Sequence, residues 1–178
     1  MTYRDTLTAL AGATEEAAVN LYLRHEAGEV TDDGFDAYLA AVVSRANGRA
    51  AAVADLGLAA AVTVALRRPV APLGIVPPAS DPDRLRRAAR TLREALDDTP
   101  DPSARVARLG RSEPLTAAAN AYSTGMSASP HVTGWTRGLS AKACQLCQWW
   151  ARGGRVFRAD HPMPTHKGCT CTPIPTIR

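Results

Sequence analysis

Aromatic residues are scarce in this sequence of 178 residues, making up only 5% of it, although 46% of its residues are hydrophobic. Most of the apolar residues are alanine and leucine. The isoleucine and phenylalanine that commonly fill β-sandwiches and barrels are rare. Alanine and leucine are strong helix formers, and alanine allows neighbouring helices to approach closely. The composition therefore predicts a mainly α protein with thin contacts between its helices.

The sequence also lacks a recognisable targeting or membrane-spanning segment. Residues 1–10 show no basic region followed by an apolar run and a cleavage site. The most apolar run, residues 50–66, is broken by Asp55 and Gly57 and falls short of the roughly 20 residues needed to cross a bilayer. We expect no membrane contact and synthesis in a reducing cytosol, where closely spaced cysteines bind metal more often than they form disulfides.

Apolar residues at helical spacing predict three helices in the first half of the chain. The first covers residues 3–26, where Gly12 marks a place at which the helix could break. The second begins at a cap around Thr31, runs to about Arg67 and forms a long antiparallel hairpin with the first. The third begins at Asp81.

Two stretches interrupt this helical pattern. Residues 69–80 contain four prolines and cannot be helical, so we expect a proline-rich arm lying along a surface. After a turn-rich break, Ser112 and Pro114 resemble a helix cap and a first helical turn. They predict two separate helical pieces, over residues 103–109 and 113–126. Together, residues 1–130 form a helical docking region, and residues 131–178 form a small C-terminal module.

Arginine carries almost all of the positive charge, and the formal net charge is +4. The third predicted helix has arginines on every face except its apolar stripe. Arg84, Arg87 and Arg90 are candidates for contact with DNA phosphates. A solvated helix face is the commoner explanation of such a run, and no aromatic residue is interleaved to stack on bases.

The chemistry of the sequence is concentrated in the C-terminal module. Cys144 and Cys147 form a Cys-x-x-Cys pair, and a His-x-x-Cys-x-Cys segment follows about twenty residues later. Two such pairs of soft donors are typical of one structural Zn²⁺. Five candidate ligands face four positions: Cys144, Cys147, His166, Cys169 and Cys171. We favour the first four, with Cys171 able to replace Cys169 or His166.

Other chemistries fit the C-terminal module less well. A redox dithiol at Cys144 and Cys147 would be expected after a strand of a βαβ unit, which the sequence does not show. A catalytic zinc needs an acidic partner, and Asp160 is the only acidic residue after Cys144. We therefore expect no enzymatic activity and no small-molecule substrate.

A small apolar core is expected beside the metal. The aromatic residues of the module make it the natural place for such packing, because so short a segment has little other apolar surface. We predict that Trp149, Trp150 and Phe157 supply it and that residues 155–158 form part of a short β-hairpin. His161 is expected to face water.

Residues 133–173 read TGWTRGLSAKACQLCQWWARGGRVFRADHPMPTHKGCTCTP. This segment resembles the C-terminal end of the phage Mu F-like minor head proteins, especially those of actinobacteriophages. The matching positions are Gly134, Trp135, Arg137, Cys144, Cys147, Gly154, His166, Cys169 and Cys171. The helical remainder is similar to the family only in outline.

The resemblance implies a non-enzymatic virion protein. Family members are associated with the portal vertex or the inner capsid and with head morphogenesis or DNA delivery. Expected partners are the portal protein, the major capsid protein and, through Arg84, Arg87 and Arg90, packaged DNA. The expected location is the virion, after assembly in the host cytoplasm. The alternative is a zinc-finger-type nucleic-acid-binding protein; a His-Asn-His nuclease is weaker, because no suitable histidine pair is present.

Overall fold

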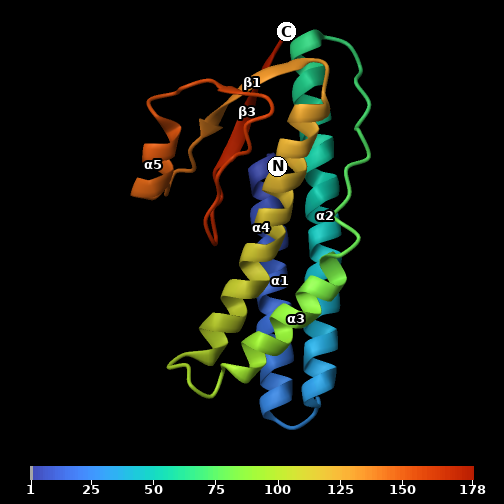
Figure 1. Ribbon diagram of the computed structural model, residues 1–178, viewed down its shortest axis with the longest axis vertical. Coiled ribbons are helices and arrows are strands. Elements are labelled where there is room, and N and C mark those ends of the chain that lie inside the picture. Colours follow the sequence, from blue (N-terminus) through green and yellow to red (C-terminus); the bar gives the residue numbers. More distant parts are fainter. Residues whose placement is uncertain (1) are drawn as a thin grey trace.

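The computed structural model describes residues 2–178, which include all of the predicted docking region 1–130 except its first residue. Three long helices run side by side, a shorter helix crosses near one end, and a small sheet lies beside the other end (Figure 1). The elements are α1 (Tyr3–Glu26), α2 (Asp32–Leu66), α3 (Asp81–Glu94), α4 (Pro102–Ala128), β1 (Val132–Gly138), α5 (Gln145–Ala151), β2 (Phe157–Arg158) and β3 (Thr172–Ile177). The mainly α fold with an antiparallel hairpin is confirmed.

Side-chain caps set the starts of the first two helices. The hydroxyl of Thr2 accepts a hydrogen bond from the amide of Asp5, whose carboxylate accepts one in return from the amide of Thr2. Thr31 caps α2 in the predicted way, by accepting from the amide of Gly34 at 3.2 Å. The helix α1 continues through Gly12 without a break.

The predicted division of α4 into two pieces is wrong, because a single helix runs through Pro114. Proline cannot donate the helical hydrogen bond to the carbonyl four residues earlier, which costs about 3 kcal/mol. Packing on both sides of the proline outweighs that cost: Val106 and Leu115 are buried in two different hydrophobic clusters. The start of the helix is capped by Asp101, and Ser112 is a buried residue within it.

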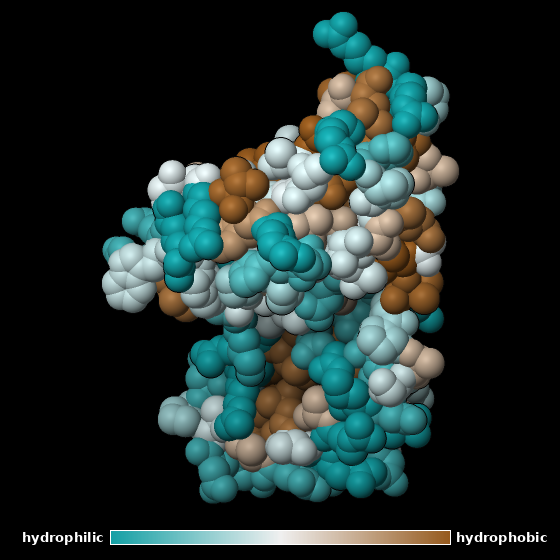
Figure 2. Space-filling model, turned by 45° about the horizontal axis from the view of Figure 1, so that its top comes forward, coloured by the Kyte–Doolittle hydropathy of each residue, from teal (hydrophilic) through white to brown (hydrophobic). Residues whose placement is uncertain are grey.

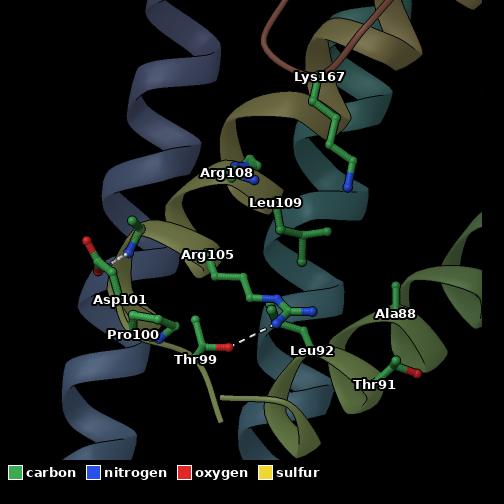
Figure 3. A pocket seen from close by; sticks show the side chains of 11 residues that line it. Ala88, Thr91, Leu92, Thr99, Pro100, Asp101, Arg105, Arg108, Leu109 and Lys167 are labelled. Atoms are coloured by element: carbon green, nitrogen blue, oxygen red, sulfur yellow. Dashed lines mark hydrogen bonds between the residues drawn. The ribbon is translucent and has the colours of Figure 1, made fainter. Parts of the chain in front are cut away.

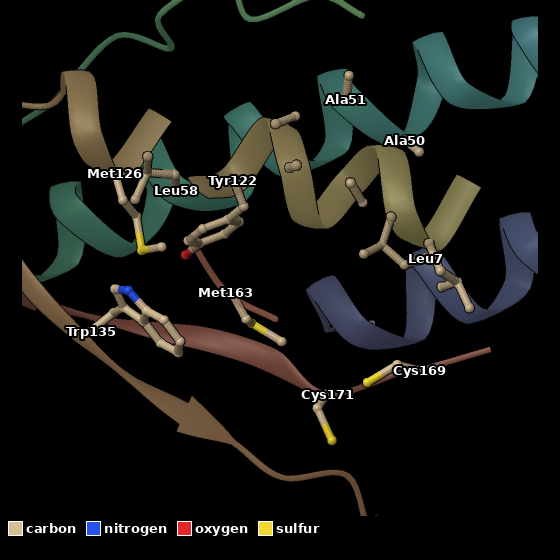
Figure 4. Packing of buried hydrophobic residues seen from close by; sticks show 14 of the residues in the cluster. Leu7, Ala50, Ala51, Leu58, Tyr122, Met126, Trp135, Met163, Cys169 and Cys171 are labelled. Atoms are coloured by element: carbon tan, nitrogen blue, oxygen red, sulfur yellow. The ribbon is translucent and has the colours of Figure 1, made fainter. Parts of the chain in front are cut away.

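The bundle has two hydrophobic clusters along its length. The cluster near α3 joins α1, α2, α3 and α4 around Phe35, Leu39 and Leu85. The other cluster continues from Leu58 and Tyr122 of the bundle into the C-terminal module, where Trp135 is fully buried (Figure 4). The module is thus packed onto the bundle through a shared core.

The strands form a three-stranded antiparallel sheet in the order β2-β1-β3, in place of a simple hairpin. The strand β3 contains Pro173 and Pro175, which pair with Arg137 and Trp135 of β1. An inner strand uses its backbone amides to bond to a neighbour on each side. Proline has no amide hydrogen to donate, so β3 is restricted to a sheet edge. The central position of β1 places its side chains between the bundle and the cysteines.

The proline-rich arm, residues 69–80, is held to α2 by a hydroxyl and a buried carboxylate. The amide of Val70 donates to the hydroxyl of Thr63 at 3.0 Å. Asp55 accepts hydrogen bonds from the amides of Leu73, Gly74 and Ile75, at 2.9, 2.6 and 3.1 Å. The arm therefore lies along the bundle in an extended conformation, as the sequence predicted (Figure 1).

Within residues 2–178, α2 is the one helix long and apolar enough to cross a membrane by length and composition alone. It also carries buried polar side chains that bind other parts of the bundle. Asn47 donates to Asp81 of α3 at 2.9 Å, and Asp55 holds the arm. These contacts are those of a core helix in a packed bundle.

Candidate metal centre

Five sulfur and nitrogen donors meet in the C-terminal module. Cys144 and Cys147 lie at the start of the short helix α5, and the other three donors lie on the loop that runs from β2 into β3. The sheet brings these segments together, since β1 pairs with both β2 and β3. We call the set the five-donor cluster; it comprises Cys144, Cys147, His166, Cys169 and Cys171.

The first half of the cluster surrounds one ring nitrogen of His166. Its Nε2 lies 3.3 Å from the Sγ of Cys144 and 3.2 Å from the Sγ of Cys147. The other ring nitrogen, Nδ1, lies 3.1 Å from the carbonyl oxygen of Lys167 and can donate to it, which leaves the Nε2 lone pair directed at the sulfurs. The two sulfurs and the ring nitrogen lie close enough together to bind one cation between them.

The second half of the cluster is formed by Cys147, Cys169 and Cys171. The Sγ atoms of Cys147 and Cys169 are 3.5 Å apart. In a tetrahedral site with metal–sulfur bonds of about 2.3 Å, neighbouring donors are about 3.5–3.8 Å apart. The cluster could therefore hold a metal ion, as the sequence predicted. Each half of the cluster is a triad of donors, and Cys147 belongs to both triads.

Local hydrogen bonds and burial act differently on the three thiols for which a shift is resolved. The amide of Cys147 bonds to the sulfur of Cys144 and lowers the pKa of that thiol. Burial, reinforced by the neighbouring Cys169, raises the pKa of Cys147. Burial also opposes ionisation of Cys171, but hydrogen bonds with Ser140, Cys147 and Cys169 together outweigh it and lower the pKa. A bound cation would favour the thiolate at every one of these positions.

A buried guanidinium lies against the cluster. The Nη1 atom of Arg137 is 3.8 Å from the sulfur of Cys147 and 3.9 Å from that of Cys169. Its Nη2 atom donates to the carbonyl of Pro164, and its Cζ lies 5.1 Å from the ring centroid of Trp150. Among the described residues no carboxylate forms an ion pair with Arg137. Within residues 2–178, the sulfurs are the only groups in contact with it that can carry negative charge.

Local structure explains the Gly-Trp-x-Arg element that precedes the cysteines. A side chain at Gly134 would overlap the carbonyl oxygen of Phe157 on β2, so only glycine permits this close approach of the strands. Trp135 is fully buried, and its indole donates to the carbonyl of His161 at 2.8 Å. Two positions later, Arg137 reaches the sulfurs. One short strand therefore joins the core of the module to its candidate metal centre.

The predicted aromatic core of the module is partly wrong. Trp149 is 67% exposed and packs no core. Trp150 does lie beside the cluster, with its ring 6.1 Å from that of His166. Phe157 stacks instead on Trp135 at 4.7 Å, and this buried tryptophan takes the place assigned to Trp149. The signal in the sequence that could have identified Trp135 is the glycine directly before it, Gly134.

His161 is exposed, as predicted. Its ring nevertheless stacks on Phe157 with the centroids 5.1 Å apart. It is not among the residues that form the five-donor cluster. It therefore supplies a nearby histidine against which the role of His166 can be measured.

The arginines of α3 are used largely within the protein. Arg84 pairs with Asp81 at 2.7 Å and also with Glu113 of α4. Arg93 pairs with Asp36 at 3.0 Å, and Arg90 lies 3.8 Å from the same carboxylate. Arg84 and Arg90 are therefore less available to DNA phosphates than the sequence alone indicated. Arg87, the third candidate, is exposed and forms no ion pair within residues 2–178.

Comparison with known proteins identifies no relative: no family model, no curated protein and no solved structure matches the chain.

Proposed function

We propose that this chain is a structural docking protein whose C-terminal module is closed by one Zn²⁺, and that it serves as a minor head protein of a tailed bacteriophage. The observation that carries the proposal is the five-donor cluster, in which two groups of three sulfur and imidazole donors from two separate segments share Cys147. Such a site joins α5 to the final strand of the sheet through the metal.

Zinc is the metal that this donor set favours. Thiolate and imidazole ligands in a tetrahedral arrangement are typical of structural zinc sites, whereas magnesium and calcium prefer oxygen donors. Within the described residues after Cys144, the only carboxylate side chain is Asp160, and it pairs at the surface with Arg158 at 2.7 Å. A nearby carboxylate acting as general base, which a catalytic zinc would use, has no candidate in the cluster.

Charge balance favours three thiolates and one imidazole as the ligand set. Zinc with three thiolates and a neutral histidine keeps one negative charge, which the buried Arg137 offsets; four thiolates would leave a second charge uncompensated. His166, with its Nε2 lone pair directed at the sulfurs, is therefore a ligand in this proposal. Cys147 is another, because it belongs to both triads. The remaining two positions are shared among Cys144, Cys169 and Cys171.

The phage assignment rests on the sequence resemblance and on the way its positions are used. Trp135, Arg137 and the five-donor cluster all belong to the resemblance, and all lie in the one module. Long helices with exposed grooves suit a protein that docks on a larger assembly. In this role the helical region 1–130 contacts the portal or the inner capsid wall, inside the virion.

Metal analysis tests the zinc assignment. The untagged protein is purified without added chelator, and its zinc is measured by mass spectrometry. We expect one zinc per chain, lost in Cys147→Ser and in His166→Ala. The matched control is His161→Ala, which removes a nearby histidine that lies outside the cluster. Zinc retained in Cys147→Ser would contradict the site.

Sedimentation with purified phage heads tests the biological role. Nuclease-treated, salt-washed heads of the phage that encodes the chain are compared with heads that lack the portal. We expect the protein in the first sample and its loss from the second. A variant lacking residues 3–68 should not be incorporated. Recovery on DNA and absence from heads would instead favour the zinc-finger alternative.

A further inference from the structure

A groove lies between α3, α4 and the segment that connects them. Its volume is about 740 Å³. Its floor includes the apolar side chains of Ala88, Leu92 and Leu109 (Figure 3). In the space-filling view, a hydrophobic hollow framed by hydrophilic residues is visible in the lower half of the molecule (Figure 2). We call this feature, with the residues of Figure 3, the α3/α4 groove.

Three cations line the α3/α4 groove: Arg105 and Arg108 of α4, and Lys167 of the C-terminal module. All three are exposed. Arg105 donates to the hydroxyl of Thr99 at 2.9 Å, and none of the three forms an ion pair within residues 2–178. The arginines of α3 provide a contrast, because Arg84 and Arg93 are matched by carboxylates of the bundle. One carboxylate, that of Asp101, also lines the groove and accepts a hydrogen bond from the amide of Ala104 at 2.8 Å. The three cations outnumber it, so the rim of the groove carries a net positive charge.

Lys167 connects this rim to the candidate metal centre. It follows His166 directly, and its carbonyl oxygen lies 3.1 Å from Nδ1 of that histidine. Figure 3 shows its side chain extending from the module toward the groove, above Leu109. Any ligand that fixes His166 therefore also fixes the backbone from which the Lys167 ammonium reaches the groove.

We infer that the α3/α4 groove is a docking site for an acidic amphipathic helix of a partner protein. The apolar floor accepts the apolar stripe of such a helix, and Arg105, Arg108 and Lys167 meet the carboxylates beside that stripe. Nucleic acid would satisfy the cations but would leave the apolar floor exposed to water. The inference deepens the proposed docking function and rests on it for the placement of Lys167.

A synthetic helix of defined composition tests the inference. The probe is a fluorescent peptide with leucines at helical spacing and glutamates at the remaining positions, and its binding to the full chain is followed by fluorescence anisotropy. We expect binding that weakens about tenfold or more in the double variant Arg105→Glu, Arg108→Glu. The matched control is Arg45→Glu, Arg49→Glu, which reverses two charges in the groove between α1 and α2. It should change affinity less than twofold, that is, by less than about 0.4 kcal/mol.

Two further probes define what would overturn the inference. A peptide with the same leucines but lysines in place of the glutamates should not bind, and replacing the leucines by glutamine should abolish binding. Equal binding of the lysine peptide, or an equal loss in the two double variants, would contradict the site. Tighter binding of duplex DNA than of the acidic peptide at the same salt would contradict the choice of partner.

The zinc content of every sample separates this inference from the proposed function. If the protein contains zinc but does not bind the acidic peptide, the groove assignment is wrong and the zinc site is still supported. Lys167→Glu should keep its zinc and bind the peptide more weakly, whereas His166→Ala should lose its zinc and also bind the peptide more weakly. Peptide binding unchanged in a zinc-free His166→Ala variant would contradict the link through Lys167.

Discussion

The helical bundle and the C-terminal module are held together in different ways. The bundle distributes its stability over two hydrophobic clusters, several caps and ion pairs such as Arg93–Asp36. The module has seven- and six-residue strands, one two-residue strand and a seven-residue helix, and its two chain segments converge on the five-donor cluster. Distributed packing tolerates the loss of one contact, whereas a single point of convergence does not.

The aromatic residues of the chain allow the two regions to be followed separately. All three tryptophans, Trp135, Trp149 and Trp150, lie in the module, and all four tyrosines lie in the bundle. Tryptophan fluorescence therefore reports on the module. Far-ultraviolet circular dichroism reports mainly on the long helices of the bundle. The predictions below use these two signals, together or singly.

Removal of the metal should have the largest effect. In the Cys147→Ser variant, or in a strong chelator, the module should unfold, because structural zinc contributes on the order of 10 kcal/mol to folding in small domains. Tryptophan fluorescence should shift to longer wavelength, with most of the helical dichroism retained. Complete loss of the helical signal would show that the bundle depends on the module. The two regions would then not be stabilised independently.

Loss of the buried guanidinium should have the next largest effect. Arg137→Met leaves the negative cluster without its cation and should destabilise the module by about 3–5 kcal/mol. Denaturant unfolding followed by tryptophan fluorescence measures this, together with zinc affinity in competition with a chelator. Arg137→Lys keeps the charge and should cost less. A stable Arg137→Met protein with unchanged zinc affinity would show that the sulfurs carry no net negative charge.

Release of the proline-rich arm should affect the bundle alone. Asp55→Ala removes the acceptor of three amide hydrogen bonds and should cost roughly 3 kcal/mol, since hydrogen bonds to a charged group are worth about 1.5–3 kcal/mol and are not additive. Residues 69–80 should become sensitive to proteases, with tryptophan fluorescence unchanged. An arm that resists proteolysis in Asp55→Ala would contradict its role as the anchor.

The smallest effects are expected from two glycines of the long helices. A methyl group at Gly110 would lie 2.9 Å from the carbonyl oxygen of Thr14, so Gly110→Ala should cost about 1–3 kcal/mol. Gly12 has nothing within 4 Å of such a methyl, so Gly12→Ala should stabilise α1 by about 0.5–1 kcal/mol. Thermal unfolding followed by dichroism measures both. Equal effects of the two substitutions would contradict the close contact of α1 with α4.

The sequence predicted the bundle well where local signals agreed with packing. Apolar periodicity and the cap at Thr31 placed α1 and α2 within a residue or two of their observed bounds. The prediction failed at Pro114, where the local signal indicates a helix start and only tertiary contacts show that α4 continues. Those contacts join residues far apart in the sequence, so no local pattern could reveal them.

The candidate metal centre was predictable because the spacing of its cysteines and histidine along the sequence is typical of a zinc site. The two short cysteine motifs identified all five donors of the cluster. The residues around the cluster were not predictable in the same way. The adjacent Trp149 and Trp150 point in different directions. The prolines of β3 hide the usual sequence pattern of a strand, although they are compatible with a sheet edge. The contact of Arg137 with the sulfurs also depends on the sheet and could not be read from the sequence alone.

X-ray absorption at the zinc edge tests the central claim most directly. The measurement is made on the untagged full chain with one equivalent of zinc, and repeated on His166→Ala. We predict three sulfur neighbours at about 2.3 Å and one nitrogen neighbour at about 2.0–2.1 Å, with the nitrogen signal lost in the variant. A shell of only nitrogen and oxygen neighbours would contradict closure of the module by zinc at these cysteines.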